Sequence, residues 1–171
     1  VLSARWDAVW PNLKPRLLER LGKPVHASGL MEFSHTGYYC QEMGSPLFRR
    51  IFAFAPGLPM DCLADIKLWT NRLEQDFARD DGTRRVNLDP GLLTLERLVL
   101  ATGKNFTHRI YLKKGVWADL TLVRRGPEWT VLDWTFPDYR TPAMLAEIEH
   151  MRTLYHQALY PPQAGRDKGQ V

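Results

Sequence analysis

The 171-residue chain contains 44% hydrophobic and 25% charged residues, values that are ordinary for a soluble globular protein, and its length predicts a single domain. No apolar run approaches the roughly 20 residues that a membrane-spanning helix needs, and two cysteines are too few for a disulfide framework. We therefore expect a cytoplasmic protein with reduced thiols and no membrane contact. The net charge of +4 leaves open whether the basic pairs face phosphate or lie solvated in turns.

The N-terminal residues predict the end of a strand followed by a helix. Residues 1–3 resemble a strand end, so we expect further sequence before them. Apolar side chains recur on one helical face over residues 6–21, and Gly22 is a suitable residue to end that helix. Pro11 and Pro15 each remove a backbone donor, which leaves open whether the helix begins near residue 11 or is kinked.

Further along, strands and a second helix are expected. Residues 25–36 predict a strand with poor alternation, and residues 36–46 a loop or short helical turn. Residues 47–55 predict a central strand, because both of its faces are largely apolar. A second helix is expected to begin with Asp61 as its N-cap and to end near residues 80–82.

The next segment predicts a turn between an extended run and a short helix. Residues 84–88 are expected to be extended, and the Asp-Pro-Gly sequence at residues 89–91 predicts a type II turn in which Gly91 adopts a positive φ. A short helix is expected to follow, with Thr94 as its N-cap and Gly103 as its end.

The C-terminal part predicts a β-meander, a helix and a tail. A hairpin is expected over residues 107–122 with its turn at residues 113–115, and a further strand over residues 129–136. Thr141 followed by proline predicts the start of the last helix. Residues 163–171 have little to bury and are expected to be disordered.

This order of elements predicts an α+β fold with a mainly antiparallel sheet. Its first part has the order of a ferredoxin-like (split βαβ) unit, which the β-meander would extend, with the helices packed on the sheet. No internal repeat or linker interrupts the sequence. We therefore expect one domain over residues 1–162.

Several long strings, in the same order, carry a resemblance to a known family. They are TGYYCQEMG, LFRRIFAF, ADIKLWTNRLE, RRVNLDPG, LERLVLATGKN, HRIYLKKGVWADLTL and WTFPDYR. On these strings the chain resembles an uncharacterised bacterial family, domain of unknown function 4416, over nearly its whole length up to the last helix. The resemblance implies a strand ahead of the first helix and supplies no activity. The chain departs from the family pattern at Leu92, often tyrosine there, and at Asp119, often glutamate.

Polar side chains recur at the ends of the predicted elements, and we expect them to gather in one cleft. The candidate catalytic groups are His108, Asp119 and Asp89. The candidate ligand-binding residues are Lys67, Asn71, Arg84, Arg85, Asn87, Lys104, Arg109, Tyr111, Asp138, Tyr139 and Arg140. Arginine forks suit phosphate or carboxylate groups, and histidine is the side chain whose ordinary pKa lies near neutrality. The leading hypothesis is therefore a protein or enzyme that binds a small anionic metabolite.

Two other functions remain open at this point. An RNA-binding module would use exposed aromatic side chains and basic turns, and a non-catalytic interaction protein would use some of the six tryptophans as anchors. We expect no metal site, because the histidines and cysteines lack ligand spacing. No Walker, GxGxxG, GxSxG or HExxH motif is present, so the cofactor remains unknown, as do the reaction and the oligomeric state.

Overall fold

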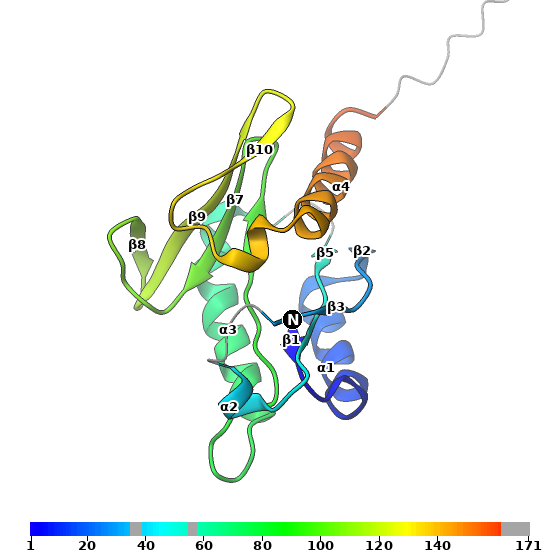
Figure 1. Ribbon diagram of the computed structural model, residues 1–171, viewed down its shortest axis with the longest axis vertical. Helices are drawn as coiled ribbons and strands as arrows, with labels where there is room; N and C mark the ends of the chain where they lie inside the picture. Colours follow the sequence, from blue (N-terminus) through cyan, green and yellow to red (C-terminus); the bar gives the residue numbers. More distant parts are fainter. Residues whose placement is uncertain (35–38, 55–57, 162–171) are drawn as a thin grey trace, which may run out of the picture.

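The structure, a computed structural model, describes residues 1–34, 39–54 and 58–161. It confirms an α+β fold with antiparallel strand pairing, in which the described residues form four α-helices and three sheets (Figure 1). No helix in these ranges combines the length and the apolar character that crossing a membrane would require. The tail predicted at residues 163–171 lies outside the described residues, as does the predicted strand end at residue 55.

Helix α1 (Trp6–Leu21) begins well before Pro11 and contains both of its prolines. Pro11 and Pro15 lie on the exposed side of the helix, whereas Leu13 between them is fully buried. Each proline removes one helical hydrogen bond, and these lost bonds face solvent rather than the core. The helix thus extends over all of residues 6–21, where the apolar side chains recur, and does not begin near residue 11.

The short strands of the first half form two separate small sheets. Strands β1 (Leu2–Ser3), β4 (Phe48–Arg49) and β3 (Met31–Glu32) form one sheet in the order β1-β4-β3. Strands β2 (Pro24–Ala27) and β5 (Phe52–Phe54) form the other. The ferredoxin-like character of this part stays a prediction.

The single central strand predicted over residues 47–55 is therefore wrong, since it is interrupted between β4 and β5. Ser28 causes part of this break, because it hydrogen-bonds both backbone groups of Ile51. The Ser28 N–H donates to the Ile51 carbonyl, and the Ile51 N–H donates to Ser28 Oγ. The strand predicted over residues 25–36 is likewise divided into β2 and β3. The short helical turn expected next is present as α2 (Cys40–Met43).

The larger sheet is five-stranded and is built around β9 (Val116–Arg125). Strand β7 (Arg97–Thr102) pairs along one edge of β9 and continues to β6 (Gly91–Leu93). Along its other edge, β9 pairs first with β8 (Arg109–Lys113) and then with β10 (Glu128–Val131). The predicted hairpin is confirmed, with Lys114 and Gly115 at positive φ in its turn.

The structure corrects the predictions for residues 89–103. The expected short helix from Thr94 to Gly103 is wrong, because this segment forms the β6–β7 hairpin. Gly91 does not have the positive φ of a type II turn; it opens β6, where an added Cβ would lie 2.8 Å from the Val99 carbonyl oxygen. Close strand approach, rather than turn geometry, accounts for this glycine.

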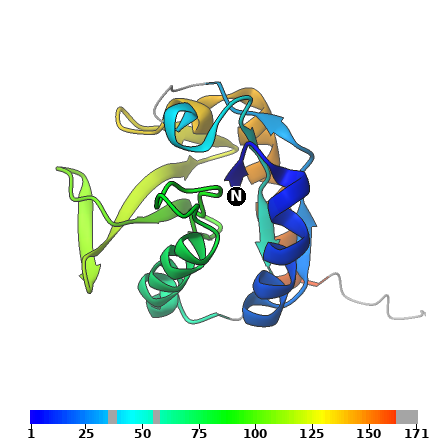
Figure 2. The same cartoon turned by 90° about the horizontal axis from the view of Figure 1, so that it is seen from below.

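Two helices, one preceding this sheet in the chain and one following it, cover its opposite faces (Figure 2). On one face Leu98, Leu100 and Leu122 pack against Met144 and Ile148 of α4 (Pro142–Leu159). The opposite face packs on α3 (Leu63–Asp76), and the buried residues there are Leu63, Ala64, Ala101 and Val116. Helix α3 also joins the cluster around α1, which contains Val9, Leu13, Leu17, Leu73, Val86 and Leu88.

The N-termini of α3 and α4 can be compared with the N-cap residues that the sequence predicted. Thr141 caps α4 as predicted, because its Oγ1 accepts a hydrogen bond of 3.2 Å from the Met144 N–H. Asp61 does not cap α3: it lies in a 3-10 turn, η1 (Met60–Cys62), and Cys62 occupies the N-cap position without a side-chain hydrogen bond. A second 3-10 turn, η2 (Pro137–Arg140), precedes α4. The last predicted strand ends at Val131 rather than at residue 136, because Thr135 Oγ1 accepts from the Leu132 N–H in a turn.

Candidate functional site

The structure places the predicted site residues in separate groups. One group surrounds Arg84, a second His108, and a third Asp138. For the part of the chain that the structure describes, no hydrogen bond or ion pair joins His108, Arg109 or Asp119 to Arg84 or Asp138.

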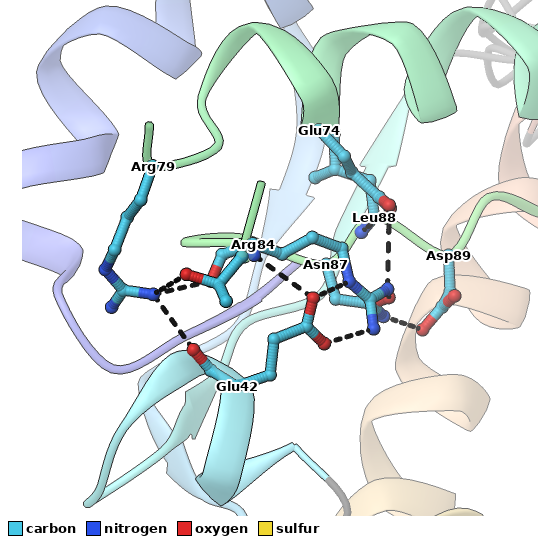
Figure 3. A network of polar contacts seen from close by, with 8 residues as sticks. Glu42, Glu74, Arg79, Arg84, Asn87, Leu88 and Asp89 are labelled. Carbon is cyan, nitrogen blue, oxygen red and sulfur yellow. Dashed lines mark hydrogen bonds and ion pairs between the residues drawn. The ribbon is translucent and has the colours of Figure 1, made fainter. Parts of the chain in front are cut away.

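The Arg84 group is shown in Figure 3, and its centre is a two-pronged ion pair between Arg84 and Glu42 of α2. Arg84 Nε donates to Glu42 Oε1 over 2.8 Å, and its NH2 donates to Oε2 over 2.7 Å. The third nitrogen, NH1, donates to Asn87 Oδ1, and Asn87 Nδ2 donates to Asp89 Oδ2. The guanidinium of Arg84 is thus occupied within the protein.

Helix α3 supplies two buried charged groups that fix the backbone of the same segment. Lys67 Nζ donates to the Leu88 carbonyl over 2.9 Å, and the Leu88 N–H donates to Glu74 Oε1 over 2.6 Å. Burial raises the pKa of the Glu74 carboxyl, which the positive charge of Lys67 partly offsets. Hydrogen bonds from Arg84 instead lower the pKa of Glu42. These contacts attach residues 84–89 to α2 and α3, which is a structural role.

A hollow of about 350 Å³ adjoins this network. It is lined by Glu42, Asn71, Glu74, Gln75, Ala78, Gly82 and Arg84. The charged groups of this lining are the Glu42 and Glu74 carboxyl groups and the Arg84 guanidinium, which is already paired with Glu42. The lining does not favour an anion.

The third group is a buried ion pair between Arg49 and Asp138. The Arg49 guanidinium also lies over the Phe33 and Tyr139 rings, 4.7 and 5.3 Å from their centroids. Burial raises the pKa of the Tyr139 hydroxyl. Beside this pair lies a hollow of about 340 Å³, which has mainly apolar side chains from β3 and α4 and also carries Glu32. The charged groups that line this second hollow are the paired Arg49 and Asp138 and the negatively charged Glu32, so it does not favour an anion either.

The His108 group is organised by Asp119, whose side chain lies on the sheet face that α4 covers. Asp119 is only 1% exposed, and its Oδ2 accepts a 2.9 Å hydrogen bond from Arg109 Nε and lies 3.2 Å from His108 Nε2. Its other oxygen, Oδ1, accepts from Thr121 Oγ1, and Thr121 is the extra residue of a β-bulge in β9. A buried carboxylate needs such partners, so Asp119 fixes the side chains of both His108 and Arg109.

Two aromatic rings pack against the imidazole of His108. Trp134 stacks on it with a centroid distance of 4.7 Å and an interplanar angle of 10°, and Phe106 contacts it edge-on. Arg109 NH1 donates to the Lys104 carbonyl. Two nitrogens of the group, His108 Nδ1 and Arg109 NH2, make no hydrogen bond to the described residues and are not among its buried unpaired atoms. These two nitrogens therefore have no partner among the described residues, although the His108 and Arg109 side chains are only 7% and 10% exposed.

Comparison with known proteins identifies the family to which this sequence belongs. The sequence model of the family called Domain of unknown function (DUF4416) matches residues 1–155. The chain belongs to this family. The resemblance to domain of unknown function 4416 that its sequence strings indicated is thereby confirmed. Searches of curated proteins and of solved structures gave no match.

The other predicted residues of this DUF4416 chain lie apart from the His108 group or serve the backbone. Arg140 donates to the Thr135 and Asp133 carbonyls and so closes its own loop. Tyr111 accepts a long hydrogen bond from the Gly115 N–H, and the side chain of Arg85 is exposed. Asn71 lines the hollow beside Glu74. The described residues contain no group of three or more histidine, cysteine, aspartate or glutamate side chains that could hold a metal ion.

Sequence reasoning missed Arg49 and Glu42, and did not place Glu74 in the candidate set. Glu42 and Arg84 are 42 positions apart, and Arg49 and Asp138 belong to different halves of the chain. No spacing rule brings such pairs together. Only the alternation of residues 47–55, with a charged residue between apolar ones, could have drawn attention to Arg49.

Proposed function

We propose that this DUF4416 chain binds a small anionic ligand at His108 and Arg109, and that His108 transfers a proton there. The observation that carries the proposal is the double use of Asp119 Oδ2, which holds His108 Nε2 and Arg109 Nε and leaves one nitrogen of each side chain available. The Arg84 guanidinium is a weaker candidate, because all three of its nitrogens donate hydrogen bonds within the protein. The Arg49 guanidinium is also weaker, because Asp138 and the Phe33 and Tyr139 rings surround it.

The chemistry follows from the hydrogen-bonding capacity of a carboxylate. An ionised carboxylate only accepts hydrogen bonds, so the hydrogen of a neutral His108 ring resides on Nε2 when that nitrogen bonds Asp119. Nδ1 then carries the lone pair and can act as a general base, as in other histidines oriented by a buried aspartate. Arg109 would bind a phosphate or carboxylate group of the ligand through NH2.

The first experiment measures thermal stabilisation by inorganic phosphate, nucleotides and small carboxylates. A ligand at about 100 times its Kd stabilises by ~2.7 kcal/mol, which for a chain of this size raises Tm by about 5–10 °C. Arg109→Gln should abolish the Tm shift. Arg85→Gln is the matched control, because that side chain is exposed and outside the group, and it should retain the shift.

His108→Gln separates binding from proton transfer. Because Arg109 remains held by Asp119, this variant should keep most of the Tm shift while losing any turnover of the bound ligand. The proposal fails if none of these anions raises the Tm of the unsubstituted protein, or if Arg85→Gln removes the shift as fully as Arg109→Gln does.

A further inference from the structure

The strand that carries Arg109 also carries an exposed aromatic ring, that of Tyr111. These two residues pair with Asp119 and Trp117 of β9, and no shift of register separates the two pairs. Because side chains alternate along a strand, Arg109 and Tyr111 lie on the same face of the sheet. Tyr111 is 53% exposed although its ring is large. A partly open aromatic ring thus lies next to the proposed anion site.

The ring of Tyr111 is held in place by two contacts. The Trp117 ring meets it with centroids 5.1 Å apart and planes at 70°, so this edge-to-face contact covers at most one of its faces. The Gly115 N–H donates to its hydroxyl over 3.4 Å, which adds a weak restraint at the other end of the side chain. A planar group can therefore stack on the remaining face without the entropy cost of ordering a mobile side chain.

The spacing of Arg109 and Tyr111 suits a ligand with an anionic end and a planar end. Two positions along a strand span about 7 Å. In a nucleotide, a pentose of comparable length separates the phosphate from the base. Aromatic side chains on the open face of a sheet are also a common surface on which nucleobases stack. A bare phosphate or a small carboxylate would use Arg109 and leave Tyr111 without a function.

We propose that the anionic ligand is a nucleotide whose phosphate is bound through Arg109 NH2 and whose base stacks on Tyr111. This inference rests on the proposed anion site and names the class of its ligand. The nucleotide is either free or part of a single-stranded RNA, since both present the same phosphate, sugar and base. Ile110 takes no part although it is 71% exposed, because it pairs with Ala118 on the opposite face of the sheet.

Isothermal titration calorimetry with adenosine 5′-monophosphate (AMP) and ribose 5-phosphate isolates the contribution of the base, because both probes carry the same sugar phosphate. AMP should bind about 5- to 150-fold more tightly, the factor that stacking of one base supplies. Tyr111→Ala should remove this difference and leave the affinity for ribose 5-phosphate unchanged, which also shows that the variant is folded. Tyr111→Phe keeps the ring and should retain the difference. Ile110→Ala, on the opposite face, is the matched control and should retain it too.

The anion site and the stacked base fail on different results. If ribose 5-phosphate binds but AMP binds no more tightly, or if Tyr111→Phe loses as much affinity for AMP as Tyr111→Ala, the base does not stack on Tyr111 and the anion site still stands. If neither probe binds, or if Arg109→Gln leaves the binding of ribose 5-phosphate unchanged, the anion site fails and the nucleotide with it.

Single-stranded penta-adenylate distinguishes the two sources of the nucleotide. Binding tighter than that of AMP, with an affinity that falls as salt is added, supports RNA, and equal or weaker binding supports a free nucleotide. In either case Tyr111→Ala should weaken the binding of the ligand, and an oligomer that binds the Tyr111→Ala variant as tightly as the unsubstituted protein would overturn the proposal for RNA.

Discussion

Arg84 directs its three guanidinium nitrogens into the protein, and Glu42 accepts from two of them. The Glu42 side chain is 27% exposed, so the pair is neither fully buried nor freely solvated. Its geometry is that of the two-pronged arginine–carboxylate pairs that contribute more than single surface contacts. Because α2 has only four residues, this ion pair contributes much of what fixes α2 to residues 84–89.

We predict that Glu42→Gln lowers the free energy of unfolding by about 1.5–3 kcal/mol, the range for hydrogen bonds that involve charged groups. Asp76→Asn is the control, because the Arg16–Asp76 pair has a similar 2.9 Å contact but both side chains are about half exposed. Such surface pairs contribute from about 0 to 1 kcal/mol. Urea unfolding at neutral pH measures both variants, and equal losses would contradict this account of the Glu42–Arg84 pair.

The same pair predicts a pH dependence. The Arg84 hydrogen bonds lower the pKa of Glu42 below its ordinary value of 4.5, so the unfolded chain takes up this proton at a higher pH than the folded chain does. The stabilisation is therefore present above about pH 4.5 and is lost as the pH falls through the folded-state pKa. The difference in unfolding free energy between Glu42→Gln and the unsubstituted protein should shrink over that interval.

Part of the candidate site could be predicted from the sequence. His108, Arg109 and Asp119 were predicted as site residues, and the structure brings them together because β8 and β9 form a hairpin, a local arrangement that turn residues reveal. Their separation from Arg84 and Asp138 could not be foreseen. It depends on which sheet each segment joins, and the short strands of the first half carry little pattern to decide that.

Among the elements, those with local start and stop signals were predicted best. Helix α4 follows a threonine N-cap and a proline, and the β8–β9 turn contains a Lys-Gly pair. Residues 94–103 were predicted as a helix because Thr94 and Gly103 resemble a cap and a stop. The segment is a hairpin because Leu98 and Leu100 are needed on one face of the sheet and Ala101 on the other, so tertiary packing outweighs local propensity.

The approach of β6 to β7 gives a prediction for Gly91. A Cβ at this position would lie 2.8 Å from both the Val99 carbonyl oxygen and a Leu100 methyl carbon, and the first of these is backbone that cannot move aside. Gly91→Ala should therefore destabilise the protein by about 1–3 kcal/mol, as overpacking does. Gly103→Ala is the control, because nothing lies within 4 Å of the added carbon and its φ is not positive. Chemical denaturation of the two variants measures the difference, and a neutral Gly91→Ala would refute the close approach.

At the scale of the whole molecule, α3 joins two halves: the part around α1 and the small sheets, and the part formed by the five-stranded sheet and α4. Its Leu73 belongs to the cluster around α1, while its Leu63 and Ala64 belong to the cluster beneath the larger sheet. Lys67 and Glu74, on the same helix, bind the Leu88 backbone between the halves. A helix of 14 residues that packs on both sides in this way cannot lose one set of contacts without weakening the other.

This shared helix leads us to predict that residues 1–162 unfold as one domain. Leu13→Ala in α1 and Leu122→Ala in β9 each empty a fully buried site and should each cost about 2–5 kcal/mol. Each variant should shift the entire transition to lower temperature, with equal calorimetric and van't Hoff enthalpies, because neither half can unfold while α3 stays packed against the other. If the halves were independent, Leu13→Ala would instead produce two transitions, only one of them displaced. Scanning calorimetry together with near- and far-UV circular dichroism distinguishes the two results, since independent halves would also make the spectroscopic midpoints disagree.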